Sequence, residues 1–230
     1  MKRVRGQATS GDNELLISMD PKATVKIGEL SRNGTSRIPV QALDHDFQPD
    51  GTVTPVGLLL PQHDELSIYM AQSKVTSDCI VDCLDALWTE KKPRFPAIDT
   101  LVLLLDNGPE NSGRRTQFLH RMVQFVDEHE IAVRLAYFPP YHSKYNPVER
   151  CWGILEQHWN GALLDGLDVV LGYAKTMTWK GKHPAVDLVT KVYKTGVSLS
   201  KKAMKVVEAR LERLADLPAY FLDIRPANTA

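Results

Sequence analysis

The apolar run Thr100–Leu105 constrains the fold of this chain more than any other stretch of its sequence. Every residue after Thr100 is a leucine or a valine, so the run is apolar on both faces of an extended strand. Strands of that kind occupy the centre of parallel sheets, where helices cover both faces. The sequence therefore predicts a layered α/β domain built around this strand.

Strand-like and helix-like patterns alternate along the chain in an order that narrows the architecture. Apolar or alternating runs predict strands at 15–20, 24–30, 54–60, 65–70 (as an extension or partner of the third), 100–105 and 131–138. Helical periodicity predicts helices at 76–88, with Thr76 or Ser77 as N-cap, at 112–129 and at 146–159. Three antiparallel strands followed by alternating helices and strands is the ribonuclease H-like order. It predicts a mixed five-stranded sheet with helices on both faces.

The C-terminal part of the chain has a different pattern. Beyond Gly161, mainly helical periodicity occupies 167–177, 186–193 and 200–217. We therefore expect a flexible N-terminus at 1–13, a ribonuclease H-like domain at 14–165, and a mainly helical C-terminal extension packed on it at 166–230.

Cysteine usage and the lack of targeting signals favour a protein of the cytoplasm. No run approaches the roughly 20 apolar residues that span a bilayer, and the basic start Met1–Gly6 is not followed by the apolar segment of a signal peptide. The three cysteines form no CxxC pair, which is typical of reduced intracellular proteins.

Three carboxylates lie at the ends of predicted buried elements. Asp106 follows the central strand, Asp20 ends the first strand, and Glu149 lies in the first turn of the helix predicted at 146–159. In open α/β sheets the functional crevice lies off the carboxyl ends of the parallel strands. In a ribonuclease H-like sheet the Asp20 and Asp106 strands are neighbours. We therefore expect all three acids to be catalytic and metal-binding residues of a phosphoryl-transfer site.

Each acid also has a purely structural interpretation. The Asp-Asn-Gly sequence at 106–108 is a strong turn signal, although a hairpin turn would lead at once into a strand and this one leads into a helix. With Asn146 as N-cap and Pro147 at the first helical position, Glu149 would complete a capping box. Asp20 precedes a proline, a common start of a turn. Taken together, the three positions favour the metal site.

Carboxylate oxygens suit Mg²⁺, a hard cation that also retains water ligands. Two such ions about 3.5–4 Å apart activate an attacking oxygen and stabilise a leaving oxygen in an in-line displacement. We therefore expect two Mg²⁺ or Mn²⁺ ions as cofactors and no protein nucleophile.

Basic residues gather in the C-terminal third, although the formal net charge is zero. Between Lys175 and Lys205 eight lysines share the segment with one acid, Asp187. Such a stretch is either a solvated helical face or a surface that follows DNA phosphates. The candidates for DNA contact are Lys175, Lys180, Lys182, Lys191 and Lys194.

Several motifs resemble those of one transposase family. They are Asp20-Pro-Lys22, Asp106-Asn-Gly108, and Phe138-Pro-Pro140 followed by Ser143-Lys144, Asn146 and Glu149. They are similar to motifs of DDE transposases of bacterial insertion sequences, most closely the Rhodopirellula-type (ISAzo13-like) transposase domain. Trp159-Asn-Gly161 and Tyr193–Val197 are further similar motifs. The likeness as a whole runs from about residue 14 to residue 224.

The resemblance implies an enzyme that cuts DNA and joins a 3′-hydroxyl to target DNA. It implies transposon ends and target DNA as partners, a homodimer or larger assembly on DNA, and a place at the bacterial nucleoid. It also implies supporting or phosphate-positioning roles for Asn107, His142, Lys144 and Asn146. Pro21 replaces the family's usual Thr, and the upstream helix-turn-helix region is missing. We therefore expect a catalytic domain alone, a truncated copy, or one half of a split enzyme.

Two other functions remain open at this point. A metal-dependent nuclease or resolvase on the same fold would hydrolyse DNA without joining the ends. A non-catalytic remnant would bind DNA or a partner through the lysines at 175–205, without metal and without cleavage.

Overall fold

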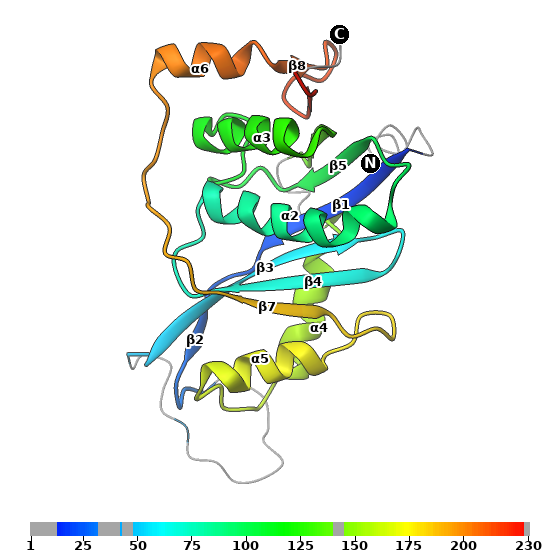
Figure 1. The fold of residues 1–230 in the computed structure, drawn as a ribbon. Coiled ribbons are helices and arrows are strands. Elements are labelled where there is room, and N and C mark those ends of the chain that lie inside the picture. Colours follow the sequence, from blue (N-terminus) through cyan, green and yellow to red (C-terminus); the bar gives the residue numbers. More distant parts are fainter. Residues whose placement is uncertain (1–12, 32–41, 43–47, 140–144, 228–230) are drawn as a thin grey trace.

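The computed structural model describes residues 13–31, 42, 48–139 and 145–227 (Figure 1). The elements in chain order are β1 (Glu14–Pro21), β2 (Val25–Ile27), β3 (Gly51–Leu60), β4 (Glu65–Ala71), α2 (Ser77–Lys91), the 3-10 helix η1 (Lys92–Arg94), β5 (Thr100–Leu105), α3 (Thr116–His129), β6 (Ala132–Tyr137), α4 (Glu149–His158), α5 (Leu167–Thr176), β7 (Ala185–Val189), α6 (Lys201–Glu208), β8 (Leu211–Arg213) and β9 (Phe221–Ile224).

The strands form one mixed sheet in the order β7-β4-β3-β1-β5-β6-β9-β8, with β2 paired to β3. The central strand β5 runs parallel to both of its neighbours, β1 and β6. Its residues Leu101–Leu105 are all buried, as the sequence predicts for a strand covered on both faces. Because β1, β5 and β6 are parallel, their carboxyl ends open on the same edge of the sheet.

Helices cover both faces of the sheet, α2 and α3 on one side and α4 and α5 on the other (Figure 1). Each face of the sheet has its own hydrophobic core, and successive strand residues point into alternate cores. Leu58 packs with α2 and α3, and Leu59 packs with α4 and α5. This arrangement confirms the prediction of a mixed α/β fold with helices on both faces. No helix in the described part of the chain is long and apolar enough to cross a membrane.

Local signals place some helix starts and miss others. Thr76 caps α2 as predicted, because its hydroxyl accepts a hydrogen bond of 3.3 Å from the Cys79 backbone N–H. The helix α3 begins at Thr116 instead of Ser112, because residues 107–115 form a loop fastened to Asp106 and to Tyr137.

The C-terminal region departs from its predicted helical pattern. Residues 185–189 form β7, parallel to β4, where a helix was predicted at 186–193. The helix α6 ends at Glu208, β8 lies inside the helix predicted at 200–217, and β9 pairs with β6. An open sheet edge offers backbone hydrogen bonds to an added strand, and these outweigh a weak helical periodicity of the apolar residues. The sheet therefore has nine strands instead of five, and the region after residue 166 adds strands as well as helices.

Candidate active site

Asp20 lies at the carboxyl end of β1, opposite Gly57 of β3, and is only 7% exposed. The indole Nε1–H of Trp152, on α4, donates a hydrogen bond of 2.9 Å to its Oδ2. Within the described residues, no other hydrogen bond or ion pair reaches this carboxylate. Among those residues, no donor competes for the Oδ1 atom.

The pKa of Asp20 responds both to its burial and to the charges of the other two predicted acids. Burial raises the pKa of Asp20 to about 7, while the hydrogen bond from Trp152 opposes the rise. The charges of Asp106 and Glu149 raise the pKa further. The fold places the acids at one edge of the sheet: Asp20 and Asp106 lie at the carboxyl ends of the parallel strands β1 and β5, and the bonds from Asn146 to Ser18 and Met19 hold the start of α4, with Glu149, at the end of β1.

Asp106 follows β5 and is oriented by its own loop. Its Oδ1 accepts hydrogen bonds from the Gly108 backbone N–H and from Nδ2 of Asn111, both at 3.1 Å. Asn107 has a left-handed backbone with φ 65°, a conformation in which Asn is enriched, and it turns the chain directly after the acid. The turn leads into a loop and α3 instead of a hairpin strand, so Asp106 stands at the end of a parallel strand.

Asn111 is a supporting residue that the sequence did not reveal. It is 1% exposed, and its backbone carbonyl accepts a hydrogen bond of 3.0 Å from the hydroxyl of Tyr137 on β6. Its side chain thus ties Asp106 to a loop that is itself tied to the sheet. In the sequence, Asn111 is one of several polar residues after a turn, and no motif or characteristic spacing identifies it as part of the site.

Asn146 does not cap α4 in the way the sequence predicts. Its buried side chain accepts a hydrogen bond from the Ser18 hydroxyl and donates one of 3.2 Å to the Met19 carbonyl. Ser18 Oγ in turn accepts a hydrogen bond of 2.9 Å from the Val148 backbone N–H. Val148 occupies the N-cap position and Glu149 is the first residue of α4. The capping-box interpretation of Glu149 is therefore wrong: the Asn146 amide fastens the helix start to β1.

Trp152 reaches Asp20 because Gly57 has no side chain. A Cβ on Gly57 would lie 2.5 and 2.6 Å from two indole carbons of Trp152 and 2.9 Å from Cγ2 of Val148. Trp152 is itself buried, with only 7% of its surface exposed. Its hydrogen bond to Asp20 went unrecognised, although its position three residues after Glu149 places both on one helix face.

The other predicted residues near the acids fall in different places. Asn107 is exposed in the loop after β5. His142 and Lys144 lie outside the described residues.

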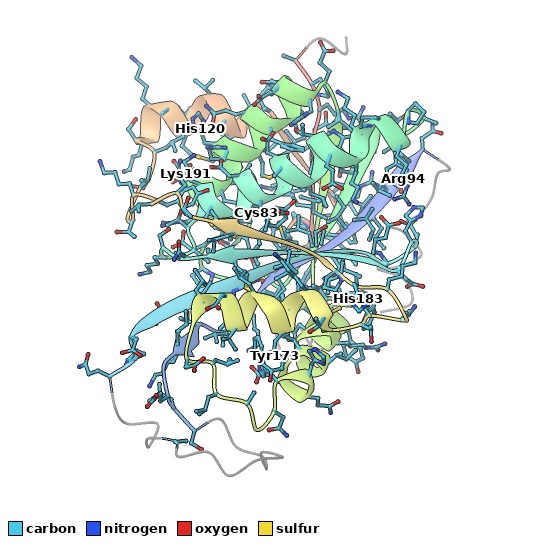
Figure 2. All side chains as sticks on the ribbon, turned by 60° about the horizontal axis from the view of Figure 1, so that its bottom comes forward. Cys83, Arg94, His120, Tyr173, His183 and Lys191 are labelled. Atoms are coloured by element: carbon cyan, nitrogen blue, oxygen red, sulfur yellow. The ribbon has the colours of Figure 1, made fainter. Side chains whose placement is uncertain are left out.

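The five predicted DNA-contacting lysines are exposed but spread over several elements. Lys180 pairs with Asp64 at 2.7 Å, and Lys182 donates to the His63 carbonyl, both at the turn between β3 and β4. Lys191 pairs with Asp82 of α2 and lies at the opposite end of β7 from His183 (Figure 2). Lys175 is on α5, and Lys194 is in the segment between β7 and α6. The structure therefore does not gather them at the three acids.

The donor set suits a hard divalent cation. In the part of the chain that the structure describes, no three His, Cys, Asp or Glu side chains converge closely enough to form a metal cluster. Asp20 is buried with one neutral donor, and its neighbours Asp106 and Glu149 offer only carboxylate oxygens, the ligand type that Mg²⁺ and Mn²⁺ take.

Two solved structures that share this fold are transposase complexes. The Mos1 transposase paired-end complex with left transposon end aligns at a TM-score of 0.53 and 9% identity, over 75% of this chain and 50% of that one. The Mos1 mariner paired end complex with Mn aligns at a TM-score of 0.50 and 11% identity, over 69% and 46%. The chain spans about half the length of these proteins, and at such identity the likeness shows the fold.

Comparisons of the sequence itself identify the family of this chain. Among curated proteins, none has a matching sequence. The model of the Rhodopirellula transposase DDE domain matches residues 2–226. With the acids at the ends of β1, β5 and α4, this match over nearly the whole sequence shows that the chain belongs to the Rhodopirellula transposase DDE domain family.

Proposed function

We propose that this chain is the catalytic domain of a transposase that cuts DNA and transfers the cut strand to a target. The observation that carries the proposal is geometric: Asp20 and Asp106 follow the neighbouring parallel strands β1 and β5, and Glu149 begins α4, which hydrogen bonds fasten to the end of β1. Membership of a transposase DDE domain family supports this chemistry over that of other proteins with a mixed α/β fold.

The proposed reaction is two displacements at phosphorus. In the first, a water oxygen attacks a phosphodiester, the bond from phosphorus to O3′ breaks, and the strand ends in a 3′-hydroxyl. In the second, that hydroxyl oxygen attacks a phosphodiester of the target, and another 3′-hydroxyl leaves. Two Mg²⁺ or Mn²⁺ ions, held by Asp20, Asp106 and Glu149, would activate the attacking oxygen and stabilise the leaving one.

The protein's own contribution is to fix the three carboxylates. Trp152 orients Asp20, the Gly108 N–H and Asn111 orient Asp106, and Asn146 sets the start of α4 and so the place of Glu149. Fixed ligands reduce the reorganisation needed in the transition state.

We further propose DNA as the partner, with a homodimer or larger assembly on it, in the cytoplasm. Exposed positions of Lys175 and Lys194 support phosphate contacts by these two lysines. The other three, Lys180, Lys182 and Lys191, would have to exchange their present partners for DNA.

The test is strand cleavage of transposon-end DNA by the purified chain with Mg²⁺ or Mn²⁺. Asp106→Asn should lower the cleavage rate by at least about 10³-fold, because several kcal/mol of charge stabilisation would be lost. Asp99→Asn is the matched control: it removes the same charge from the opposite end of β5, where Asp99 is exposed. Cleavage and joining are read on denaturing gels with a labelled strand and a plasmid target.

The outcomes separate the alternatives. Full cleavage by Asp106→Asn would refute the proposed site. Hydrolysis without joining by the wild-type chain would identify a nuclease. Metal-independent DNA binding without any cleavage would identify a non-catalytic remnant.

A further inference from the structure

A cavity of about 660 Å³ opens at Asn107, the residue that directly follows Asp106. It is formed by two segments that are distant in sequence, the loop between β5 and α3 and the turn between β8 and β9. The lining residues are Asn107, Ser112, Gly113, Arg114, Arg213, Pro218 and Ala219. Its volume lies within the range of about 300–1,000 Å³ that is typical of ligand pockets.

The cavity lies at the catalytic edge of the sheet. Asn107, which directly follows Asp106, is part of its wall. The turn 214–220 reaches the same edge, because the Tyr220 carbonyl accepts a hydrogen bond of 2.8 Å from the backbone N–H of Tyr137 at the end of β6. The cavity therefore lies next to the place where, in the proposed reaction, Asp106 would help to bind the phosphodiester that is cut.

The charge of the lining is purely positive. Arg114 is exposed and forms no ion pair or hydrogen bond within the described residues. Arg213 forms an ion pair with Glu208, to which its Nε and Nη2 donate at 3.3 and 3.2 Å, and its Nη2 also donates to the Gly113 carbonyl at 3.3 Å. Its Nη1 finds no acceptor among the described residues and stays available to a ligand. Guanidinium groups with spare N–H donors are suited to phosphate oxygens.

A second cavity on the same sheet shows the contrast. It measures about 430 Å³ and is lined by Arg134 and Arg225, but also by Asp99, Glu130 and Asp223. It lies at the opposite end of β5 and β6, and Asp223 pairs with Arg134 at 2.8 Å. The two cavities therefore differ in their lining: three acids line the second, whereas the only charged residues that line the first are Arg114 and Arg213, and Glu208, the partner of Arg213, lies outside that lining.

The wall of the cavity is held in shape. Tyr137 packs against Gly113, where an added Cβ would lie 3.1 Å from a ring carbon, and its hydroxyl donates to the Asn111 carbonyl. The contact from Arg213 to Gly113 joins the β8–β9 hairpin to this loop. A preformed wall reduces the ordering cost of binding.

We propose that this cavity binds one nucleotide of a DNA strand next to the phosphodiester that Asp106 addresses, with Arg114 and Arg213 on its phosphate. The inference rests on the proposed function and adds a substrate-binding role for the β8–β9 hairpin. The volume fits a nucleotide better than a bare phosphate ion, and the arginines supply the charge.

The test is DNA binding without divalent metal. The affinity for a fluorescein-labelled duplex of about 20 base pairs is measured by anisotropy across a salt series, in EDTA. Arg114→Gln should weaken binding by about 3–10-fold and flatten the slope of log K against log salt by about 0.9, the value for one lost phosphate contact. Arg225→Gln is the matched control, because it makes the same change at an exposed arginine of the opposite cavity.

Equal loss of affinity in both variants would overturn the proposal, as would unchanged binding in Arg114→Gln or no measurable binding by the wild-type chain at low salt. Because Arg114 is exposed and forms no ion pair or hydrogen bond within the described residues, its replacement should leave the melting temperature unchanged. Cleavage assays with Asp106→Asn report separately on the proposed function. An active enzyme with normal Arg114→Gln binding would refute the cavity alone. Selective loss of binding in an inactive chain would support the cavity and refute the enzyme.

Discussion

Asp20→Asn should abolish metal-dependent strand cleavage and, in the same protein, raise stability at neutral pH without metal. The variant loses a charged ligand, so we expect a fall in rate of at least about 10³-fold. It also removes a buried carboxylate whose single hydrogen bond comes from Trp152. An asparagine oxygen can accept that bond without a buried charge.

The pH dependence follows from the pKa of Asp20, which burial raises from 3.8 to about 7 in the folded protein. The folded state therefore holds the proton more tightly than the unfolded chain. The stabilisation by the protonated group is full below pH 3.8 and is lost as pH rises through 7. The gap between wild type and Asp20→Asn should be small near pH 4 and largest above 7, with an upper bound of about 4 kcal/mol.

Urea unfolding in EDTA from about pH 5 to pH 8 measures this gap, which should widen by about 2–3 kcal/mol over the range. Adding Mg²⁺ should stabilise the wild type by about 2–3 kcal/mol at 100 times the dissociation constant, and should leave the variant nearly unchanged. A gap that does not change with pH would show that Asp20 is not the buried, shifted acid described here.

Gly57→Ala should both destabilise the fold and impair cleavage, although Gly57 itself carries no chemistry. The added Cβ would lie 2.5 Å from an indole carbon of Trp152 and 2.9 Å from Val148. The rigid indole must move, which breaks its hydrogen bond to Asp20. We expect a loss of about 1–3 kcal/mol in the free energy of unfolding from overpacking, and cleavage slowed by about 10–100-fold from misplacement of the acid.

A double-mutant cycle isolates the cause. Trp152→Phe removes the two clashing indole carbons and leaves only the closer approach to Val148, so Gly57→Ala should cost less in that background, with a coupling of about 1–3 kcal/mol. The double variant should regain stability but not full activity, because phenylalanine cannot donate to Asp20. The control is Gly153→Ala on the same helix, where no atom lies within 4 Å of the new Cβ. There the change should stabilise by about 0.5–1 kcal/mol. Additive costs in the cycle would contradict the steric explanation.

Local periodicity was sufficient where an element's apolar pattern is strong. The runs at 100–105 and 131–138 became β5 and β6, and the helical stripe at 76–88 became α2. In these segments burial on one or both faces follows directly from residue order. The segment at 185–189 has no such pattern, and its conformation depends on the open edge of β4, which only the assembled sheet provides.

The same distinction separates the three acids from the residues that orient them. By itself, the sequence determined the central strand, the α/β layering and the placement of Asp20, Asp106 and Glu149 at element ends. These features follow from hydrophobic periodicity and from the turn residues that end each element, and both signals act within a few residues. The tertiary structure decided that Asn146 bonds to Ser18 instead of capping a helix, and that Trp152 bonds to Asp20 across Gly57. These pairs lie 128 and 132 positions apart. Contacts at such separation depend on how the sheet and helices pack, and no local pattern encodes them.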